Sequence, residues 1–458
     1  MSHNPAPMAA EAARTAAERV TTILGGARRA RVIAVLAAVL GLSGADVATV
    51  GASATELRHA LGISDTQIGL LVATTLLVGA LATIPFGMLA DRVRRTTTLA
   101  VAVGLWGAAM AWSAAASDYE MLLAARIFLG VVTAAAGPLI ASLVGDYFEG
   151  GERGRTWGFI LTGELLGVGF GFVVTGDIAV FSWRAAFVVL AIPAFALAWL
   201  VARLPEPERS GGGDDDAAGM SLAEAARHVL RVRTNTLLIA SSSLGYYFLA
   251  GLQTFGAEFA KKQYGVNQAE VNVLVLIIGV GALAGVLAGG AAGDLLMRRG
   301  HVSARVTVAA VTAALAAVLF VPAVLSSGAF TALPYLIAAA FMLAAQNPPL
   351  DAARLDVMPA RLWGRAEAVR TVVRSLAQAM APLLFGVMSD RVFGGGRSGL
   401  QWTFLVMLLP LAGSAAILWR ARATYPGDAA AAGERSRAQP DAGARRVSRS
   451  ERSSSGTG

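Results

Sequence analysis

Four charged residues lie deep inside long apolar segments, where an ionised side chain is stable only beside water or an opposite charge. Asp46 lies roughly 14 residues into the first segment, about 21 Å along a helix. Arg126 enters the fourth segment from the opposite side and reaches a similar depth. Burial disfavours an ionised carboxylate and a nearby arginine favours it, so Asp46 could carry a proton. The alternative is a permanent Asp46–Arg126 ion pair.

Glu164 and Arg374 are a second candidate set, in the fifth and eleventh apolar segments, and 374 − 164 = 210 residues separate them. Glu164 could carry a proton, and Arg374 could hold an anionic headgroup or neutralise an acid. Alternatively, both lie nearer the helix ends and are simply hydrated. Other polar residues at depth could line the same pocket or serve packing and interfacial roles: Tyr246, Tyr247, Gln253, Gln346 and Asn347.

Two short acid–base segments each follow an apolar stretch. Residues 87–95 read Gly-Met-Leu-Ala-Asp-Arg-Val-Arg-Arg, and a fainter copy occupies residues 290–299. The acids in the two copies, Asp91 and Asp294, are 294 − 91 = 203 residues apart. These charges could merely anchor helix ends at a membrane surface. Because acid and base return together, we favour a specific contact that forms twice.

Composition independently predicts a membrane protein. The chain is 55% hydrophobic and 15% charged, with a mean hydropathy of +0.60, and a soluble protein of this length would carry more charge. The net charge of +8 comes from arginines spread between apolar segments, which is a poor pattern for nucleic-acid binding. Cysteine is absent, so no disulfide or cysteine-ligated metal is expected. No cleavable signal peptide is evident.

Apolar stretches of about 20 residues, each long enough to cross a bilayer, predict twelve helices. The expected ranges are 32–55, 65–90, 96–116, 120–147, 154–177, 183–204, 236–260, 269–296, 304–325, 331–357, 363–389 and 400–422. An even number puts both termini on one side, and the loops on that side hold more arginine. The positive-inside rule therefore predicts cytoplasmic termini.

These spans predict two six-helix bundles, at residues 31–204 and 236–425. Residues 1–30 are expected to be a cytoplasmic segment, and 426–458 a disordered cytoplasmic tail. Between the bundles, residues 205–235 are expected to be a cytoplasmic linker. It contains an amphipathic helix over 221–233, at the inner membrane surface. The bundles repeat: Pro138 and Pro348, Asp146 and Asp356, and Arg155 and Arg365 are each 210 residues apart.

Residues 87–95 resemble the signature loop of the major facilitator superfamily, Gly-x-Leu-Ala-Asp-Arg-x-Gly-Arg-Arg, with Arg94 in place of the second glycine. The resemblance implies parallel six-helix repeats and a cytoplasmic latch. Asp91 would face the helix start near Gly364, and Asp294 the helix start near Arg155. Arg95 would reach Asp146, and Arg298 would reach Asp356. The expected latch residues are Gly87, Asp91, Arg92, Arg95, Asp146, Asp294, Arg298 and Asp356.

Glycines in the fifth segment partly resemble the antiporter signature of drug exporters in this superfamily. They are Gly158, Gly167, Gly171 and Gly176. The proline expected after Gly171 is Phe172. Close packing of helices on small residues is the safer interpretation.

Residues 61–70, Leu-Gly-Ile-Ser-Asp-Thr-Gln-Ile-Gly-Leu, resemble the start of the second helix in Spinster-type transporters, and residues 347–390 are similar as well. Members of that family move lysophospholipids, sphingoid lipids or other amphiphiles, with protons in bacterial examples. Two positions differ: the family's arginine after the acid is Val47, and its fourth-helix glutamate is Thr133. We hypothesise that Glu164 replaces that glutamate.

These observations predict an all-α transporter of the bacterial cytoplasmic membrane that works by alternating access. The leading function is proton-coupled export of an amphipathic or hydrophobic small molecule, lysolipid-like or drug-like. The alternative is proton-coupled uptake of a small organic anion held by Arg126 or Arg374. An enzyme is disfavoured because no nucleophile–base or metal-ligand cluster is found, and a channel because the halves are duplicated. The expected partners are a small-molecule or lipid substrate, protons and the bilayer, with no cofactor, metal or nucleic acid, and the expected state is a monomer.

Overall fold

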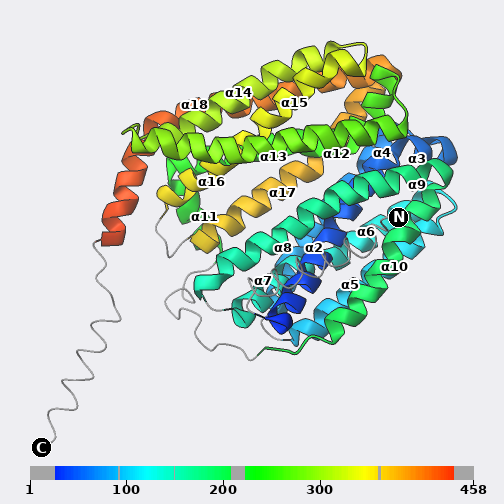
Figure 1. Cartoon of the computed structure of the whole chain (residues 1–458), viewed down its shortest axis with the longest axis horizontal. Helices are drawn as coiled ribbons and strands as arrows, with labels where there is room; N and C mark the ends of the chain where they lie inside the picture. The colour runs from blue at the N-terminus through cyan, green and yellow to red at the C-terminus, as the bar shows by residue number, and fades with distance from the viewer. Residues whose placement is uncertain (1–25, 91–92, 149, 208–221, 359–362, 438–458) are drawn as a thin grey trace, which may run out of the picture.

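The computed structural model describes residues 26–90, 93–148, 150–207, 222–358 and 363–437. Within these ranges the chain is helical and contains no strand. Figure 1 shows two bundles, the first coloured blue to green and the second green to red. The predicted all-α membrane fold with two pseudo-symmetric bundles is confirmed.

The first bundle, called the N bundle below, contains the spans expected from residues 31–204. Its elements are α2 (Ala27–Ala52), α3 (Ala54–Leu61), α4 (Asp65–Ala90), α5 (Arg95–Ala114), α6 (Tyr119–Thr133), α7 (Ala136–Tyr147), α8 (Gly150–Phe170), η1 (Gly171–Thr175), α9 (Gly176–Phe181) and α10 (Trp183–Ala202). The predicted fourth span is divided into α6 and α7, and the fifth contains the π-helical turn η1.

The second bundle, the C bundle, has the same order of spans. Its elements are α11 (Leu222–Arg231), α12 (Arg233–Tyr264), α13 (Gln268–Arg298), α14 (Ala304–Leu325), α15 (Ala329–Ala345), α16 (Asn347–Asp356), α17 (Trp363–Val387), η3 (Met388–Val392) and α18 (Gly396–Arg437). The division of its fourth span into α15 and α16 matches that of α6 and α7, as expected for a repeat.

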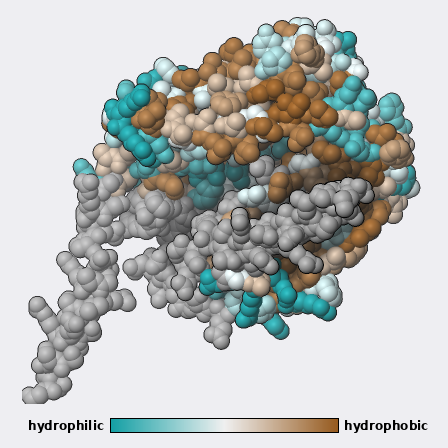
Figure 2. All heavy atoms as spheres, in the orientation of Figure 1, coloured by the Kyte–Doolittle hydropathy of each residue, from teal (hydrophilic) through white to brown (hydrophobic). Residues whose placement is uncertain are grey.

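Eleven segments of the described ranges are long and apolar enough to cross a membrane. The expected span that is not among these eleven, residues 236–260, corresponds to α12, which has 32 residues but carries more polar side chains. Many of these face the other helices: Asn235, Ser241, Ser242 and Glu258 are buried. Because α12 packs against α2, α17 and α18, its polar residues face protein and need not face lipid. Hydrophobic residues cover much of the face of the C bundle that Figure 2 shows.

Small residues allow α2 and α8 to pack closely. A Cβ added to Gly167 would lie 1.9 Å from the carbonyl oxygen of Gly41, and one added to Gly171 would lie 2.4 Å from Cα of Ala45. Neither position can hold a side chain unless the helices move apart. This contact supports the packing interpretation of the glycines in the fifth span.

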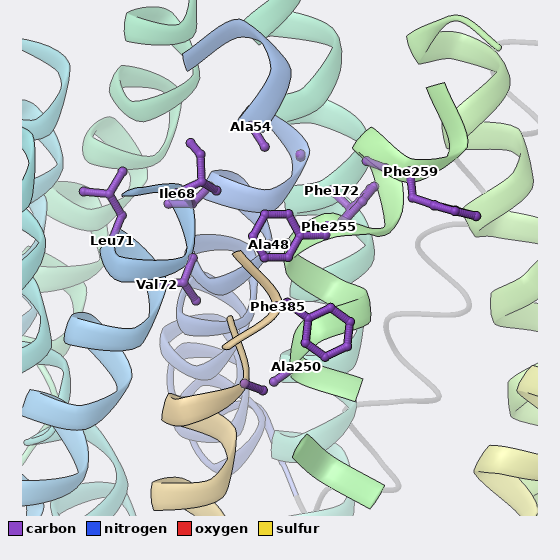
Figure 3. Packing of buried hydrophobic residues seen from close by; sticks show 14 of the residues in the cluster. Ala48, Ala54, Ile68, Leu71, Val72, Phe172, Ala250, Phe255, Phe259 and Phe385 are labelled. Carbon is purple, nitrogen blue, oxygen red and sulfur yellow. The ribbon is translucent and has the colours of Figure 1, made fainter. Parts of the chain in front are cut away.

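An apolar layer joins the two bundles. Figure 3 shows Ala48 and Phe172 of the N bundle close to Phe255 and Phe385 of the C bundle. The rings of Phe255 and Phe385 stack at 6.3 Å between centroids. Here Gly51 meets the backbone of α12, where an added Cβ would lie 2.3 Å from the carbonyl oxygen of Gln253.

The predicted disordered tail from residue 426 is wrong in its first part, because α18 continues to Arg437. Tyr425 is buried, and Ala432 is buried about two turns further on. Asp428 accepts a hydrogen bond from the backbone N–H of Thr234 at 2.9 Å, so the extension of α18 covers the start of α12. The expected amphipathic helix at 221–233 is present as α11.

Candidate functional site

Asp46 of α2 and Arg126 of α6 form a buried ion pair. Arg126 Nη1 donates to Asp46 Oδ1 at 2.8 Å, and the two residues are 3% and 2% exposed. The carbonyl group of Arg126 also accepts from Thr75 at 3.1 Å, which fixes α6 against α4. Because both charges are removed from water, loss of either partner would leave the other uncompensated.

Glu164 of α8, in the N bundle, and Arg374 of α17, in the C bundle, lie close enough for their opposite charges to attract one another. Neither forms an ion pair within 4 Å with a described residue. The guanidinium of Arg374 lies over the ring of Tyr246, 4.7 Å from its centroid, and its Nε–H donates to no described residue. Glu164 is exposed. An acid and a base thus lie near one another at pseudo-symmetric positions, and the Arg374 side chain can still donate a hydrogen bond through Nε.

A four-residue charge ring, which sequence reasoning missed, lies one turn from Arg374. Arg354 bonds to Asp351 at 2.7 Å and to Glu367, while Arg370 bonds to Asp351 at 3.2 Å and to Glu367. Both arginines are buried, while the side chains of Asp351 and Glu367 are 51% and 45% exposed. The ring therefore connects α16 to α17. The i, i+3 spacing of acid and base on both helices could have indicated it.

This ring has no counterpart in the N bundle. The residues 210 positions earlier are all apolar: Ala141, Val144, Trp157 and Ile160. The two halves therefore repeat in fold but differ in charge next to the central polar residues.

Of the remaining polar candidates, some lie beside Arg374 and others pack between helices. Tyr246 contacts Arg374, as described above. Tyr247 is buried and its hydroxyl lies 3.3 Å from Met407 Sδ, so it belongs to the packing of α12 on α18. Gln346 is buried against Gly245, whereas Gln253 and Asn347 are half-buried.

In the N bundle, Arg95 bonds to Asp146 and also to Glu206, a residue that sequence reasoning missed. Glu206 accepts from Arg95 Nε at 3.0 Å and from the backbone N–H groups of Arg95 and Thr96 at 3.0 and 2.9 Å. It therefore caps the start of α5. Burial tends to raise the pKa of Glu206, but bonds from Thr96 and Arg95 outweigh burial and lower the pKa to about 2.

The expected Arg298–Asp356 contact is wrong: Arg305 takes the place of Arg298. Arg305 bonds to Asp356 at 2.5 Å and to Asp294 at 3.3 Å, while Arg298 is exposed in the last turn of α13. Since 305 − 95 = 210 and 356 − 146 = 210, the Arg305–Asp356 pair is the repeat of Arg95–Asp146. Asp91 and Asp294 are 203 residues apart, but from Arg95 and Arg305 onward the corresponding residues of the two bundles are 210 residues apart.

The cross-bundle part of the latch lies largely outside the described residues. Asp91 and Arg92 are among the residues not described, and Gly87 is described only as part of helix α4. Asp294, which is described, pairs within its own bundle through Arg305.

A second set of charges joins the bundles at the opposite end, called the gate end here. It is formed by α3, the start of α4, the end of α12 and η3 (Figure 1). Arg58 pairs with Glu258, and Lys261 with Glu56 at 3.0 Å. Asp390 accepts from the backbone N–H and hydroxyl of Thr66 at 2.6 and 2.8 Å. Each of these contacts crosses from one bundle to the other, and none was predicted.

Two repeated helical bundles with buried charges between them define a secondary transporter of the alternating-access class. Residues 36–382 match the family model of the Major Facilitator Superfamily, and the chain belongs to this superfamily. Its family and its structural neighbours are transporters, not enzymes.

Among curated relatives, the probable galactarate/D-glucarate transporter of Bacillus subtilis is 22% identical over 303 residues, which are 59% of this chain and 66% of the relative. Protein spinster homolog 3 of Danio rerio is 27% identical over 238 residues, 50% of this chain and 47% of the relative. The probable L-galactonate transporter of Escherichia coli is 28% identical over 143 residues, or 31% of this chain. The chain spans between 32% and 66% of the length of such relatives.

Among solved structures, a bacterial homolog of the human lysosomal transporter Spinster, inward-facing and unoccupied, has a TM-score of 0.78 at 20% identity. The match covers 88% of this chain and 98% of that one. The nucleoside transporter NupG has a TM-score of 0.67 at 13% identity. At these identities the likeness concerns the fold. Together with the Spinster relatives, this structural match confirms the predicted resemblance to Spinster-type transporters, which was based on residues 61–70 and 347–390.

Proposed function

We propose that this transporter exports an amphipathic or hydrophobic small molecule in exchange for protons. The observation that carries the proposal is the facing of Glu164 and Arg374 across the bundles without an ion pair. Ionisable residues within membrane spans are rare, usually face a water-filled cavity or an opposite charge, and mark substrate or proton pathways. The four charges of the neighbouring ring pair with one another, and apart from them the surrounding spans offer few polar groups, which favours a substrate whose body is apolar.

Asp46 and Glu164 are the proposed proton carriers. Glu164 lies at the level of Asp46, since a Cβ added to Gly44 would lie 2.5 Å from the carbonyl oxygen of Glu164. Protonation of Asp46 would remove the charge that holds Arg126, and so would couple a proton to a change between α2 and α6. Thr133 bonds to a backbone carbonyl and supplies no acid at its position, which leaves Glu164 as the available carboxylate.

Arg374 and Tyr246 are the proposed contacts for a polar headgroup. The tyrosine ring holds the guanidinium from one face by a cation–π contact. The Nε group has no described partner and could donate to an anionic or zwitterionic substrate.

We further propose a monomer in a bacterial cytoplasmic membrane with both termini in the cytoplasm. The excess of arginine in the loops on the side of the termini supports this orientation. The acid–base segments then form a cytoplasmic latch, with Asp91 and Asp294 at helix starts of the opposite bundle and with Arg305 in the role expected of Arg298.

Transport in proteoliposomes with an imposed pH gradient tests the function. A fluorescent lysolipid analogue and a hydrophobic cationic dye are the probes. Gradient-driven transport should be lost in Asp46→Asn and in Glu164→Gln, whereas exchange of labelled for unlabelled probe without a gradient should persist. Glu120→Gln, at an exposed acid in α6, is the matched control. Unchanged gradient-driven transport in both variants would show that the proton assignment is wrong.

A second candidate is proton-coupled uptake of a small organic anion. Relatives named for galactarate, D-glucarate, D-galactonate and 4-hydroxybenzoate transport favour it, as do the three arginines of α16 and α17, Arg354, Arg370 and Arg374. Radiolabelled galactonate and 4-hydroxybenzoate in the same vesicles distinguish the two. Saturable, gradient-driven uptake of either anion, with no movement of the amphiphiles, would favour this candidate.

A further inference from the structure

The gate end contains two carboxylates that are buried together. Glu258 is 1% exposed and the side chain of Asp65 is fully buried. A single nitrogen, Arg58 Nη1, faces both acids, since it bonds to Glu258 Oε1 and lies 3.0 Å from Asp65 Oδ1. Lys262 Nζ is placed 2.6 Å from the same Glu258 oxygen. Both bases therefore contact the same oxygen of Glu258, Oε1.

Each carboxylate keeps one buried oxygen that accepts no hydrogen bond from the described residues. On Asp65 it is Oδ1, which has only the ion-pair contact to Arg58, while Oδ2 accepts from Ser389 at 2.8 Å. On Glu258 it is Oε2. A buried, ionised carboxylate oxygen without a donor is unfavourable, and a proton on either acid would remove the charge of that acid and so lower this cost.

The charges around the pair also favour a proton. The charged groups that face it are Glu56, Arg58 and Asp65 of the N bundle, and Glu258, Lys261, Lys262 and Asp390 of the C bundle. Glu56 and Lys261 neutralise one another. This leaves three acids, Asp65, Glu258 and Asp390, against the two bases Arg58 and Lys262. Fully ionised, the cluster carries one excess negative charge, which one proton would cancel.

We propose that the closed gate holds a proton on the Asp65–Glu258 pair, and that closing the gate takes this proton from the water on that side. When the bundles separate, water reaches both acids. Arg58 stays beside Asp65 in the N bundle and Lys262 stays beside Glu258 on α12, so both acids can then ionise. The gate end is thus a proton site separate from Asp46 and Glu164. The inference rests on alternating access and does not depend on the proposed substrate.

The sign of the pH effect follows from linkage. Because the closed gate binds more protons than the separated one, lower pH favours closure. For one proton, the ratio of closed to separated molecules can change by at most about tenfold per pH unit.

Distances between spin labels across the gate test the proposal. The chain has no cysteine, so Ser117→Cys and Ser327→Cys, at exposed positions on the N and C bundles, give one labelled pair. The closed fraction of the detergent-purified protein should rise as pH falls from 8 to 5. The double variant Asp65→Asn/Glu258→Gln should lose this dependence. Arg58→Gln removes a base, so it should populate separated molecules at high pH and steepen the dependence.

Two controls isolate the site. His59→Gln, at the exposed histidine next to Arg58, should keep the wild-type pH dependence. A variant with Asp46→Asn and Glu164→Gln should also keep it, which separates this inference from the proposed function. The inference is overturned if closure weakens at low pH, if the Asp65→Asn/Glu258→Gln protein keeps the dependence, or if neither the wild type nor Arg58→Gln responds to pH.

Discussion

Glu206 binds Arg95 twice, through the side-chain Nε and through the backbone N–H, each at 3.0 Å. The residue lies just beyond the last span of the N bundle, yet it holds the start of the third span. The loop that carries the acid–base segment at 87–95 is therefore fixed at its far end by the connection that leads to the C bundle.

Glu206 should stabilise the protein in a pH-dependent way. Its pKa is lowered to about 2, so its contribution is present above the usual glutamate pKa of about 4.3 and is lost as pH falls toward 2. Glu206→Gln should cost about 0.5–2 kcal/mol at pH 7, the range for a helix cap, and less at pH 3. Thermal unfolding followed by tryptophan fluorescence measures both. Glu120→Gln is the control, and an equal loss at both pH values would contradict the assignment.

Arg305 and Arg298 should differ sharply on substitution. Arg305→Gln removes the shared partner of Asp294 and Asp356 and should cost about 1–3 kcal/mol, because it breaks charge-assisted hydrogen bonds. Arg298→Gln should stay within about 0.5 kcal/mol, as for most exposed positions. Thermal unfolding of the two variants side by side gives the comparison. If Arg298→Gln proves the more damaging, the assignment of Arg305 as the repeat of Arg95 fails.

The buried pair Asp46–Arg126 should behave as a unit in stability. Arg126→Gln alone leaves a buried carboxylate and should cost about 3–5 kcal/mol. Asp46→Asn added to that variant should recover much of the loss, since no uncompensated charge remains. A double-mutant cycle in thermal unfolding measures the coupling. Additive losses would mean that the two charges act independently.

Two glycines of α8, Gly167 and Gly169, allow a controlled test of how closely α8 packs against α2. A Cβ on Gly167 would collide with the backbone of α2, whereas one on Gly169 meets nothing within 4 Å. Gly167→Ala should therefore destabilise by about 1–3 kcal/mol. Gly169→Ala should be neutral or stabilising by up to about 1 kcal/mol, because alanine favours the helix. Equal tolerance of the two variants would exclude close packing of α2 and α8.

The sequence predicts the spans well because each is a long apolar run, a strong local signal. It also identifies Asp46 and Arg126, since a charge at such depth needs a partner and few are available. Arg305 was missed because Asp294 and Asp356 follow different offsets, and only the three-dimensional repeat decides which arginine lies between them.

Residues whose partners are distant in sequence could not be predicted. Arg58 and Glu258 are 200 residues apart. Each has oppositely charged residues nearer in the chain, and the sequence alone favours pairing with those neighbours. Glu206 looks like an ordinary linker residue between two prolines. Its role depends on the chain turning back to α5, which no local pattern indicates.

The extension of α18 has a consequence for the order of assembly during synthesis. Glu206 completes the N bundle before any span of the C bundle has been made. The start of α12, by contrast, must wait for Asp428, which emerges from the ribosome 194 residues after its partner Thr234. The N bundle can therefore mature first and serve as a template, while the C bundle stays incomplete until its last helix arrives.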